Sequence, residues 1–133
     1  MIAVIQRVSS ARVEVGKQNI AQIGQGILAL VGIEKEDGLQ QCERMLQRLI
    51  GYRIFADSKG KMNLGLKDIQ GGLLLVPQFT LVADTSSGMR PGFSTAAEPL
   101  EGQRLFEYLL QQAQRHAVEV YSGRFGADMQ VSL

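Results

Sequence analysis

The first third of the chain consists of short apolar stretches separated by turn residues. Partial alternation of apolar and polar side chains predicts β-strands over residues 2–8 and 12–15. Turn residues at 16–19 precede another apolar stretch at 20–23, and the continuous apolar run 27–31 follows soon after. A run of that length without polar residues predicts a central strand that is buried on both faces.

Two later segments have the apolar spacing of amphipathic helices. Apolar residues recur on one helical face between residues 39 and 52 and again between 100 and 115, and Pro99 suits the first turn of the second helix. The remaining strand candidates are residues 73–76, 118–121 and 129–133. These elements predict a single compact α/β domain with at least five strands and two long helices.

The composition is that of an ordinary folded protein with little net charge. Hydrophobic residues make up 45% of the 133 residues, and 14 Lys plus Arg against 13 Asp plus Glu leave a formal charge of +1. Bulk charge therefore cannot hold long stretches of nucleic acid, so any RNA contact must be local. No apolar run reaches the ~18 residues that span a bilayer, and the amino terminus lacks the charge order of a signal peptide. We expect no membrane partner and a cytoplasmic location.

The sequence contains none of the familiar catalytic constellations. The single cysteine, Cys42, falls on the apolar stripe of the first predicted helix, where a buried core thiol is expected. The single histidine, His116, lies at the polar end of the second helix, so neither a histidine-based triad nor a polyhistidine metal site is predicted. The candidate carboxylate pairs lie in turn-like polar stretches, which favours solvated loops. We expect no metal and no cofactor.

The most informative segment begins at the end of the predicted strand 73–76. Gln78, Phe79 and Thr80 follow shortly, and a long stretch rich in turn residues then covers 83–94. Strand ends and long loops are where α/β folds place ligands. Taken by residue type alone, a strand that continues into a surface loop explains this pattern at least as well as a binding site does.

Several stretches spread over nearly the whole chain match the pattern of one family. They are residues 1–8 (MIAVIQRV), 51–55 (GYRIF), 61–64 (KMNL), 78–85 (QFTLVADT), 88–94 (GMRPGFS) and 123–133 (GRFGADMQVSL). On these residues the chain resembles the D-aminoacyl-tRNA deacylases. The resemblance implies hydrolysis of the ester between a D-amino acid, or glycine mischarged on tRNA-Ala, and the terminal adenosine at the tRNA acceptor end. Free D-amino acid and tRNA would be released, as chirality proofreading in translation.

The resemblance also implies where the site lies. It places the catalytic groups at Gln78, Phe79 and Thr80. The substrate-binding residues that it implies are Arg7, Phe125 and Met129. Arg7 would hold a Gly-Pro loop of the partner subunit in a homodimer with two interfacial sites, and the other two would lie near the terminal adenosine. By residue type alone, these three would be a solvated strand arginine and two core apolar side chains.

The chain departs from the family pattern at two places. Pro77 replaces the serine of the family's Ser-Gln-x-Thr motif. The family's Asn-x-Gly-Pro-Val-Thr motif, whose cis Gly-Pro peptide rejects L-amino acids in the partner's site, would follow directly after Leu133. We therefore expect residues 1–133 to form a single deacylase domain without that segment. Both a truncated chain and a protein that lacks the chirality filter fit this sequence.

A site poor in histidine and cysteine suits an ester that is already activated and has a ribose 2′-hydroxyl beside it. Main-chain N–H groups of Gln78, Phe79 and Thr80 are the expected oxyanion donors, and Pro77 removes a donor at its own position only. Two other functions stay open. The Pro77 departure and the missing motif are also compatible with a catalytically weak dimer of the same fold that binds the tRNA end or a nucleotide, or with a purely structural dimer.

Overall fold

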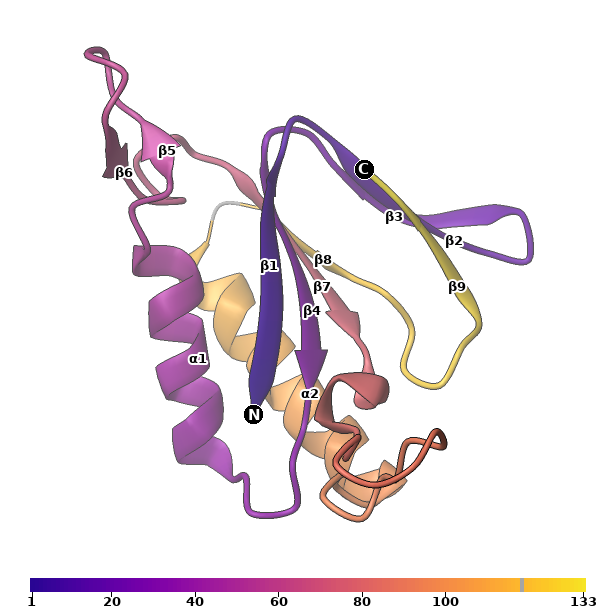
Figure 1. Ribbon diagram of the computed structural model, residues 1–133. Coiled ribbons are helices and arrows are strands. Elements are labelled where there is room, and N and C mark those ends of the chain that lie inside the picture. The colour runs from indigo at the N-terminus through magenta and orange to yellow at the C-terminus, as the bar shows by residue number, and fades with distance from the viewer. Residues whose placement is uncertain (118) are drawn as a thin grey trace.

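The computed structural model describes residues 1–117 and 119–133 (Figure 1). Its helices are α1 (Leu39–Gly51), α2 (Pro99–His116) and the short 3₁₀ helix η1 (Phe79–Val82). Its strands are β1 (Ile2–Val8), β2 (Ala11–Val15), β3 (Gln18–Ile23), β4 (Gly26–Gly32), β5 (Phe55–Ala56), β6 (Met62–Leu64), β7 (Gly72–Pro77), β8 (Glu119–Ser122) and β9 (Met129–Ser132). The prediction of an α/β domain with two long helices and at least five strands is confirmed.

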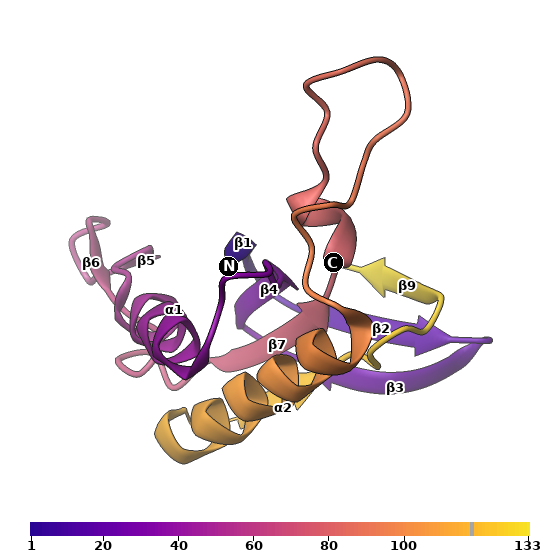
Figure 2. The same ribbon diagram turned by 90° about the horizontal axis from the view of Figure 1, so that it is seen from below.

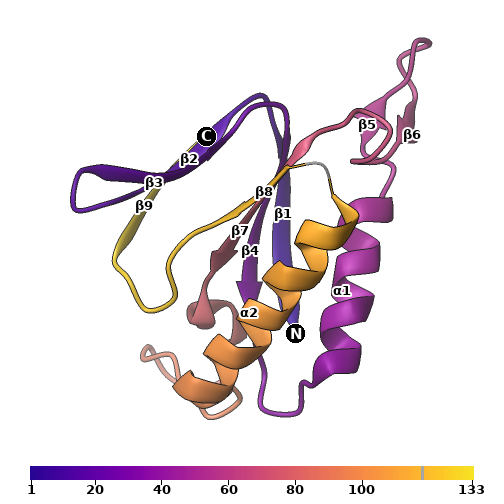
Figure 3. The same ribbon diagram turned by 180° about the vertical axis from the view of Figure 1, so that it is seen from behind.

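The main sheet contains β1, β4, β7 and β8 in that spatial order. β1 runs antiparallel to β4, whereas β4, β7 and β8 are parallel to one another. Parallel neighbours need a crossover connection, and α1 and α2 lie in the two crossovers. Figure 3 shows both helices in front of the same face of this sheet. Because the strands are parallel, β4 and β7 end on the same side of the molecule, and β7 leads from there into η1 (Figure 1).

The main sheet is buried between two layers. On the helix side, Ile27 of β4 and Leu73 of β7 belong to a core cluster that includes the apolar stripes of α1 and α2. On the other side, Leu28 and Leu74 pack with residues of the second sheet, whose strand order is β3-β2-β9. Side chains alternate between the faces of a strand, so a strand that is covered on both sides is apolar throughout. The predicted central strand at 27–31 is therefore confirmed.

The predicted elements differ from the observed ones by one or two residues at their ends. The first long helix ends at Gly51, and the second includes Pro99 at its beginning, as expected from the fixed φ of proline. The strand predicted at 118–121 is β8, and Val118 lies outside the described residues. A small two-stranded sheet of β5 and β6 lies in the connection between α1 and β7. Within residues 1–117 and 119–133, no helix has the length and apolar character to cross a membrane.

Candidate functional site

β7 ends at a proline, and the pairing of its neighbour explains why a proline is tolerated there. N–H groups of successive strand residues point to opposite neighbours, and position 77 faces β8. β8 pairs with β7 only as far as Leu75, which lies opposite Ser122 and accepts a 2.8 Å hydrogen bond from the N–H of Gly123. Beyond that point β8 has left the sheet, so no partner strand needs an N–H from Pro77.

The chain turns sharply after Pro77 and leaves two N–H groups without an acceptor. The N–H of Gln78 donates to the carbonyl of Val31 at 2.8 Å, which extends the pairing with β4 by one residue. The N–H groups of Phe79 and Thr80 begin η1 and form no hydrogen bond within the part of the chain that the structure describes. Gln78 was therefore wrongly expected to supply an oxyanion donor from its backbone. Its side-chain amide instead donates to the hydroxyl of Thr80.

An apolar cavity of about 270 Å³ lies beside these groups. Its lining residues are Pro77, Phe79, Ala96, Ala97, Pro99, Phe125 and Gly126. They come from the end of β7, the start of η1, the segment that leads into α2 together with the first residue of α2, and the loop between β8 and β9. The parallel topology brings these segments to one end of the sheet. The ring of Phe79 is 59% exposed and contacts the ring of Phe93, with 5.1 Å between the centroids. The cavity can therefore hold a flat apolar group next to Phe79, whose N–H is unused, and the unused N–H of Thr80 belongs to the following residue.

Backbone hydrogen bonds fix one wall of this cavity to the end of β4. The N–H of Ala97 donates to the carbonyl of Ile33 at 3.0 Å, and the N–H of Lys35 donates to the carbonyl of Thr95 at 3.0 Å. The hydroxyl of Thr95 donates to the carbonyl of Val82 at 2.6 Å, which ties the same wall to η1. These hydrogen bonds connect the wall to η1, where the two donors lie.

Phe125 and Met129 both lie at this end of the sheet. Phe125 lines the cavity and contacts Phe106 of α2, with 6.5 Å between the ring centroids. The sulfur of Met129 accepts a 3.3 Å hydrogen bond from the N–H of Arg124 and lies beside Gly123, where an added Cβ would come within 2.6 Å of it. The structure thus brings these two predicted residues to the same end of the sheet as Phe79.

Arg7 lies at the opposite end of the main sheet. It pairs with Ile27 in β4, whereas the end of β7 is level with Val31, four residues further along β4. Four residues of strand correspond to about 13 Å. The Arg7 guanidinium donates to the carbonyl of Ile54 at 2.7 Å. Within one protomer, Arg7 is therefore not part of the group formed by the other predicted site residues.

No side chain that lines the cavity is a candidate for a catalytic acid, base or nucleophile. None of the seven residues that line the cavity is ionisable. Cys42 is fully buried in the helical layer, as predicted, and burial raises the pKa of its thiol to about 11. Near the site, Asp84 accepts two hydrogen bonds from Ser86, which lower the pKa of the Asp84 carboxyl. The arrangement can bind and polarise an electrophilic carbonyl but cannot attack one.

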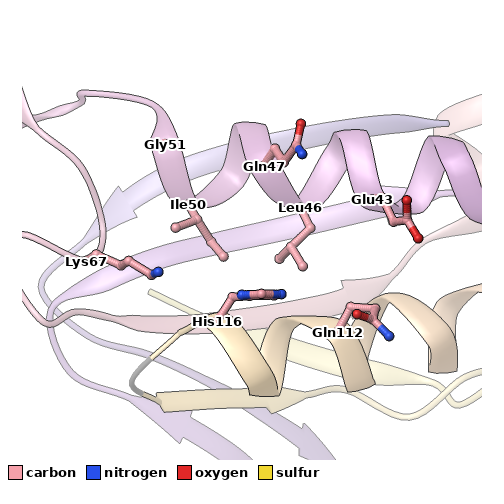
Figure 4. Close-up of a pocket in the computed structure, with 8 residues that line it drawn as sticks. All are labelled: Glu43, Leu46, Gln47, Ile50, Gly51, Lys67, Gln112 and His116. Atoms are coloured by element: carbon pink, nitrogen blue, oxygen red, sulfur yellow. The ribbon is translucent and has the colours of Figure 1, made fainter.

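A larger hollow, of about 430 Å³, lies away from these residues, between α1 and α2 (Figure 4). Leu46 and Ile50 of α1 point towards His116 of α2 across it, and Lys67 closes one end. It includes none of the predicted site residues. His116 is exposed there, in agreement with its expected place at the polar end of the helix.

Comparison with known proteins decides the family. Residues 4–133 match the family model described as D-Tyr-tRNA(Tyr) deacylase. The chain belongs to this family. A D-aminoacyl-tRNA deacylase of Pseudomonas putida (strain W619) is 59% identical over 133 residues, which are 100% of this chain and 92% of that protein. A D-aminoacyl-tRNA deacylase of Nitrosococcus oceani (strain ATCC 19707) is 56% identical, with 100% of this chain and 86% of that protein covered.

Solved structures share the fold of this chain. A structure described as the c-Myc DNA Unwinding Element Binding Protein superimposes with a TM-score of 0.92 at 36% identity, covering 97% of this chain and 88% of that one. A probable eukaryotic D-amino acid tRNA deacylase superimposes with a TM-score of 0.83 at 13% identity, over 98% of this chain and 92% of that one, and so supports the fold alone. Family membership makes the chain a hydrolase of the D-aminoacyl-tRNA deacylase class, as the sequence motifs implied.

Some residues of the candidate site could not be identified from the sequence. Ala96, Ala97 and Pro99 line the cavity, yet their small or apolar side chains gave no chemical signal in the sequence. Gly126 has a φ of 77°, a left-handed conformation that favours glycine, and it shapes the loop that carries Phe125. A glycine beside an aromatic residue in the family-like stretch 123–133 was the one available sign of such a turn.

Proposed function

We propose that this chain hydrolyses the ester bond of D-aminoacyl-tRNA with the backbone N–H groups of Phe79 and Thr80 as its oxyanion donors. The observation that carries the proposal is the presence of two unused donors beside an apolar cavity without an ionisable lining residue. Water adds to the ester carbonyl carbon, the bond from this carbon to the ribose oxygen breaks, and the ribose oxygen takes up a proton. Free amino acid and tRNA result.

Two donors are enough for this reaction because the substrate brings much of the reactivity itself. An aminoacyl ester is activated, and the neighbouring ribose 2′-hydroxyl is available to relay a proton. One preorganised oxyanion donor typically contributes about 2.7–4 kcal/mol of transition-state stabilisation. The rigid cavity wall and the short turn after Pro77 hold the donors in place before the substrate arrives.

The cavity supports a binding role for Phe125 towards the terminal adenosine, and Met129, which lies beside Gly123 near the same end of the sheet, is proposed to contribute as well. Its volume of about 270 Å³ suits one flat ring system rather than a larger ligand. Phe79 and Phe125 offer aromatic surface in its lining, and stacking on such surface is a general way of holding an unpaired base. Recognition limited to the acceptor end of tRNA also fits the formal charge of +1.

A homodimer is the proposed assembly. β1 is an edge strand of seven residues with no neighbour on its outer side among the described residues, and its Ile2 and Val4 side chains are 39% and 51% exposed. Open edges and exposed apolar residues of this kind are usually covered by a partner. Arg7 lies on this strand, and in the proposed dimer it contacts a loop of the second copy. A monomeric mass for the active protein in solution would contradict this assembly.

Glycine is the second proposed amino acid, on tRNA-Ala mischarged with it. Glycine has no side chain at its α-carbon, so a filter that acts on configuration has nothing to reject. We also place the protein in the cytoplasm, where aminoacyl-tRNAs are made and used.

Hydrolysis of D-tyrosyl-tRNA tests the proposed function directly. Loss of the ester is followed over time with purified protein, and we expect a rate far above that of spontaneous hydrolysis. Binding of tRNA without turnover would contradict the proposal and indicate a dimer that only binds the RNA end. Neither binding nor turnover would indicate a structural role.

L-tyrosyl-tRNA tests the origin of the chirality filter. We infer that a Gly-Pro segment from the partner supplies it, as the family resemblance implies. A protein consisting of residues 1–133 alone is then expected to discriminate poorly, and addition of an Asn-x-Gly-Pro-Val-Thr segment to restore the D-preference. A tenfold preference requires a free-energy difference of about 1.4 kcal/mol between the transition states for the D- and L-substrates. Strong D-selectivity of residues 1–133 alone would place the filter within them.

A further inference from the structure

We propose that the loop from Asp84 to Gly92, hereafter the 84–92 loop, binds the sugar-phosphate backbone of the tRNA acceptor strand next to the terminal adenosine, with Arg90 contacting a phosphate. The inference rests on the proposed function and extends it from the terminal nucleotide to its neighbours. Figure 2 shows this loop standing out from the body of the protein beyond η1.

Two exposed side chains of the loop, those of Met89 and Arg90, form no contact with the described residues that stabilises the fold. Met89 is 100% exposed, the highest value among the large hydrophobic residues. Arg90 is exposed as well, and its guanidinium forms no salt bridge within residues 1–117 and 119–133. A flexible apolar side chain and a free guanidinium at a loop tip contribute little to stability, whereas both are suited to contact a ligand.

The base of the loop is nevertheless well ordered by its own contacts. Asp84 and Gly92 exchange two backbone hydrogen bonds of 2.7 and 2.9 Å. The Asp84 carboxylate also accepts hydrogen bonds from the N–H and the hydroxyl of Ser86, at 2.9 and 2.6 Å. Arg90 precedes Pro91, which restricts its backbone to extended conformations. A preorganised loop loses less conformational entropy on binding than a mobile one.

The loop is connected to the site through an aromatic contact at its end. Phe93 directly follows the loop, and its ring contacts the ring of Phe79, whose N–H is one of the two proposed oxyanion donors. On another side of the cavity, Arg124 is adjacent to Phe125, is exposed and likewise has no salt bridge in the described part of the chain. Two arginines without a salt bridge in the described part of the chain are therefore found near the cavity in the sequence: Arg124 precedes the lining residue Phe125, and Arg90 lies three residues before Phe93, which contacts the lining residue Phe79.

The chemistry of these groups favours a nucleic-acid backbone over other occupants. A strand whose terminal adenosine fills the cavity must leave it past one of the flanking loops. Arginine binds phosphate through a planar fork of donors, and such contacts require no basic surface elsewhere. The nearest carboxylate in sequence, Asp84, is occupied by Ser86 at the base of the loop.

Comparison of two substrates tests the inference. D-tyrosyl-tRNA carries the acceptor-strand phosphates, whereas the D-tyrosyl ester of adenosine carries the same ester without them. Arg90→Ala is expected to raise KM for D-tyrosyl-tRNA about tenfold, to leave kcat unchanged and to leave hydrolysis of the adenosine ester unchanged. A plot of the logarithm of the tRNA association constant against the logarithm of the salt concentration has a negative slope. The magnitude of this slope should decrease by about 0.7, the value for one lost single-strand phosphate contact. Arg90→Lys should recover part of the binding, since it keeps the charge.

Arg115→Ala is the matched control. Arg115 is an exposed arginine in the last turn of α2, about 24 Å along the helix axis from Pro99 at the cavity. We expect no change in KM for either substrate. Equal loss of activity on both substrates with Arg90→Ala, or no change on either, would overturn the inference, and so would a shift of Arg90→Ala from dimer to monomer.

The inference can also be separated from the proposed function. If the unmodified protein hydrolyses neither substrate, the proposed function fails, and the affinity for uncharged tRNA decides the role of the loop. A weaker affinity of Arg90→Ala than of Arg115→Ala for uncharged tRNA would support the contact. Equal affinities would overturn it.

Discussion

Phe79→Pro is expected to reduce kcat for D-tyrosyl-tRNA by about 10²–10³-fold, the usual cost of losing one oxyanion donor. Proline removes the N–H of residue 79 without leaving a protein acceptor unpaired, because that N–H has no partner in the described structure. The backbone also accepts proline there. Residue 79 begins η1, where a helix tolerates proline, and Gln78 before it has φ −143° and ψ 87°, outside the α region that a following proline disfavours.

Two substitutions separate the backbone from the side chains in this experiment. Phe79→Leu loses the aromatic contact with Phe93 but keeps the N–H, so it should retain much more activity than Phe79→Pro. Thr80→Ala removes the hydroxyl and its hydrogen bond from the Gln78 amide but keeps the second donor, and should also retain measurable deacylation. Single-turnover rates on D-tyrosyl-tRNA compare all three variants. Equal activity of Phe79→Pro and Phe79→Leu, or a covalent aminoacyl adduct on Thr80, would refute the oxyanion mechanism.

Most of the fold could be predicted from the sequence because its elements have strong and simple patterns. The run 27–31 contains only apolar residues, and a strand of this kind has to lie between two covering layers, as β4 does. Cys42 falls on an amphipathic stripe with Leu46 and Leu49, and all three are buried. Local periodicity determines such elements, so no knowledge of the tertiary structure is needed to find them.

The site could be predicted only in part, because its geometry depends on pairings between distant segments. Whether Gln78 has a free N–H depends on its partner Val31 in another strand, and nothing near Gln78 in the sequence reveals that hydrogen bond. The cavity joins Ala96 and Phe125 to the end of β7, segments that the crossover through α2 brings together. The position of Arg7 could not be predicted for the same reason, since its distance from the end of β7 depends on how β1 and β7 pair with β4.

The close approach of β4 and β7 at their first residues leads to the second large expected effect. Gly26 and Gly72 lie opposite each other in the parallel pair. A Cβ added at Gly26 would lie 1.9 Å from the carbonyl oxygen of Gly72 and 2.7 Å from its carbonyl carbon and nitrogen. All three are backbone atoms that are held by the sheet, so no side-chain rotation relieves the contact. The strands would have to separate at this point.

Gly26→Ala is therefore expected to lower the free energy of unfolding by about 3 kcal/mol, at the upper end of the usual cost of overpacking. Gly24→Ala is the matched control in the same turn, because a Cβ there meets nothing within 4 Å, and it should leave stability nearly unchanged. Urea unfolding measures both, and the midpoint of Gly26→Ala should fall by about 1 M or more at an unchanged slope. Since Gly26 pairs with the start of β7 and Phe79 follows its end, folded Gly26→Ala should keep its kcat on D-tyrosyl-tRNA. Equal midpoints for the two alanine variants would show that the two strands can move apart at no cost.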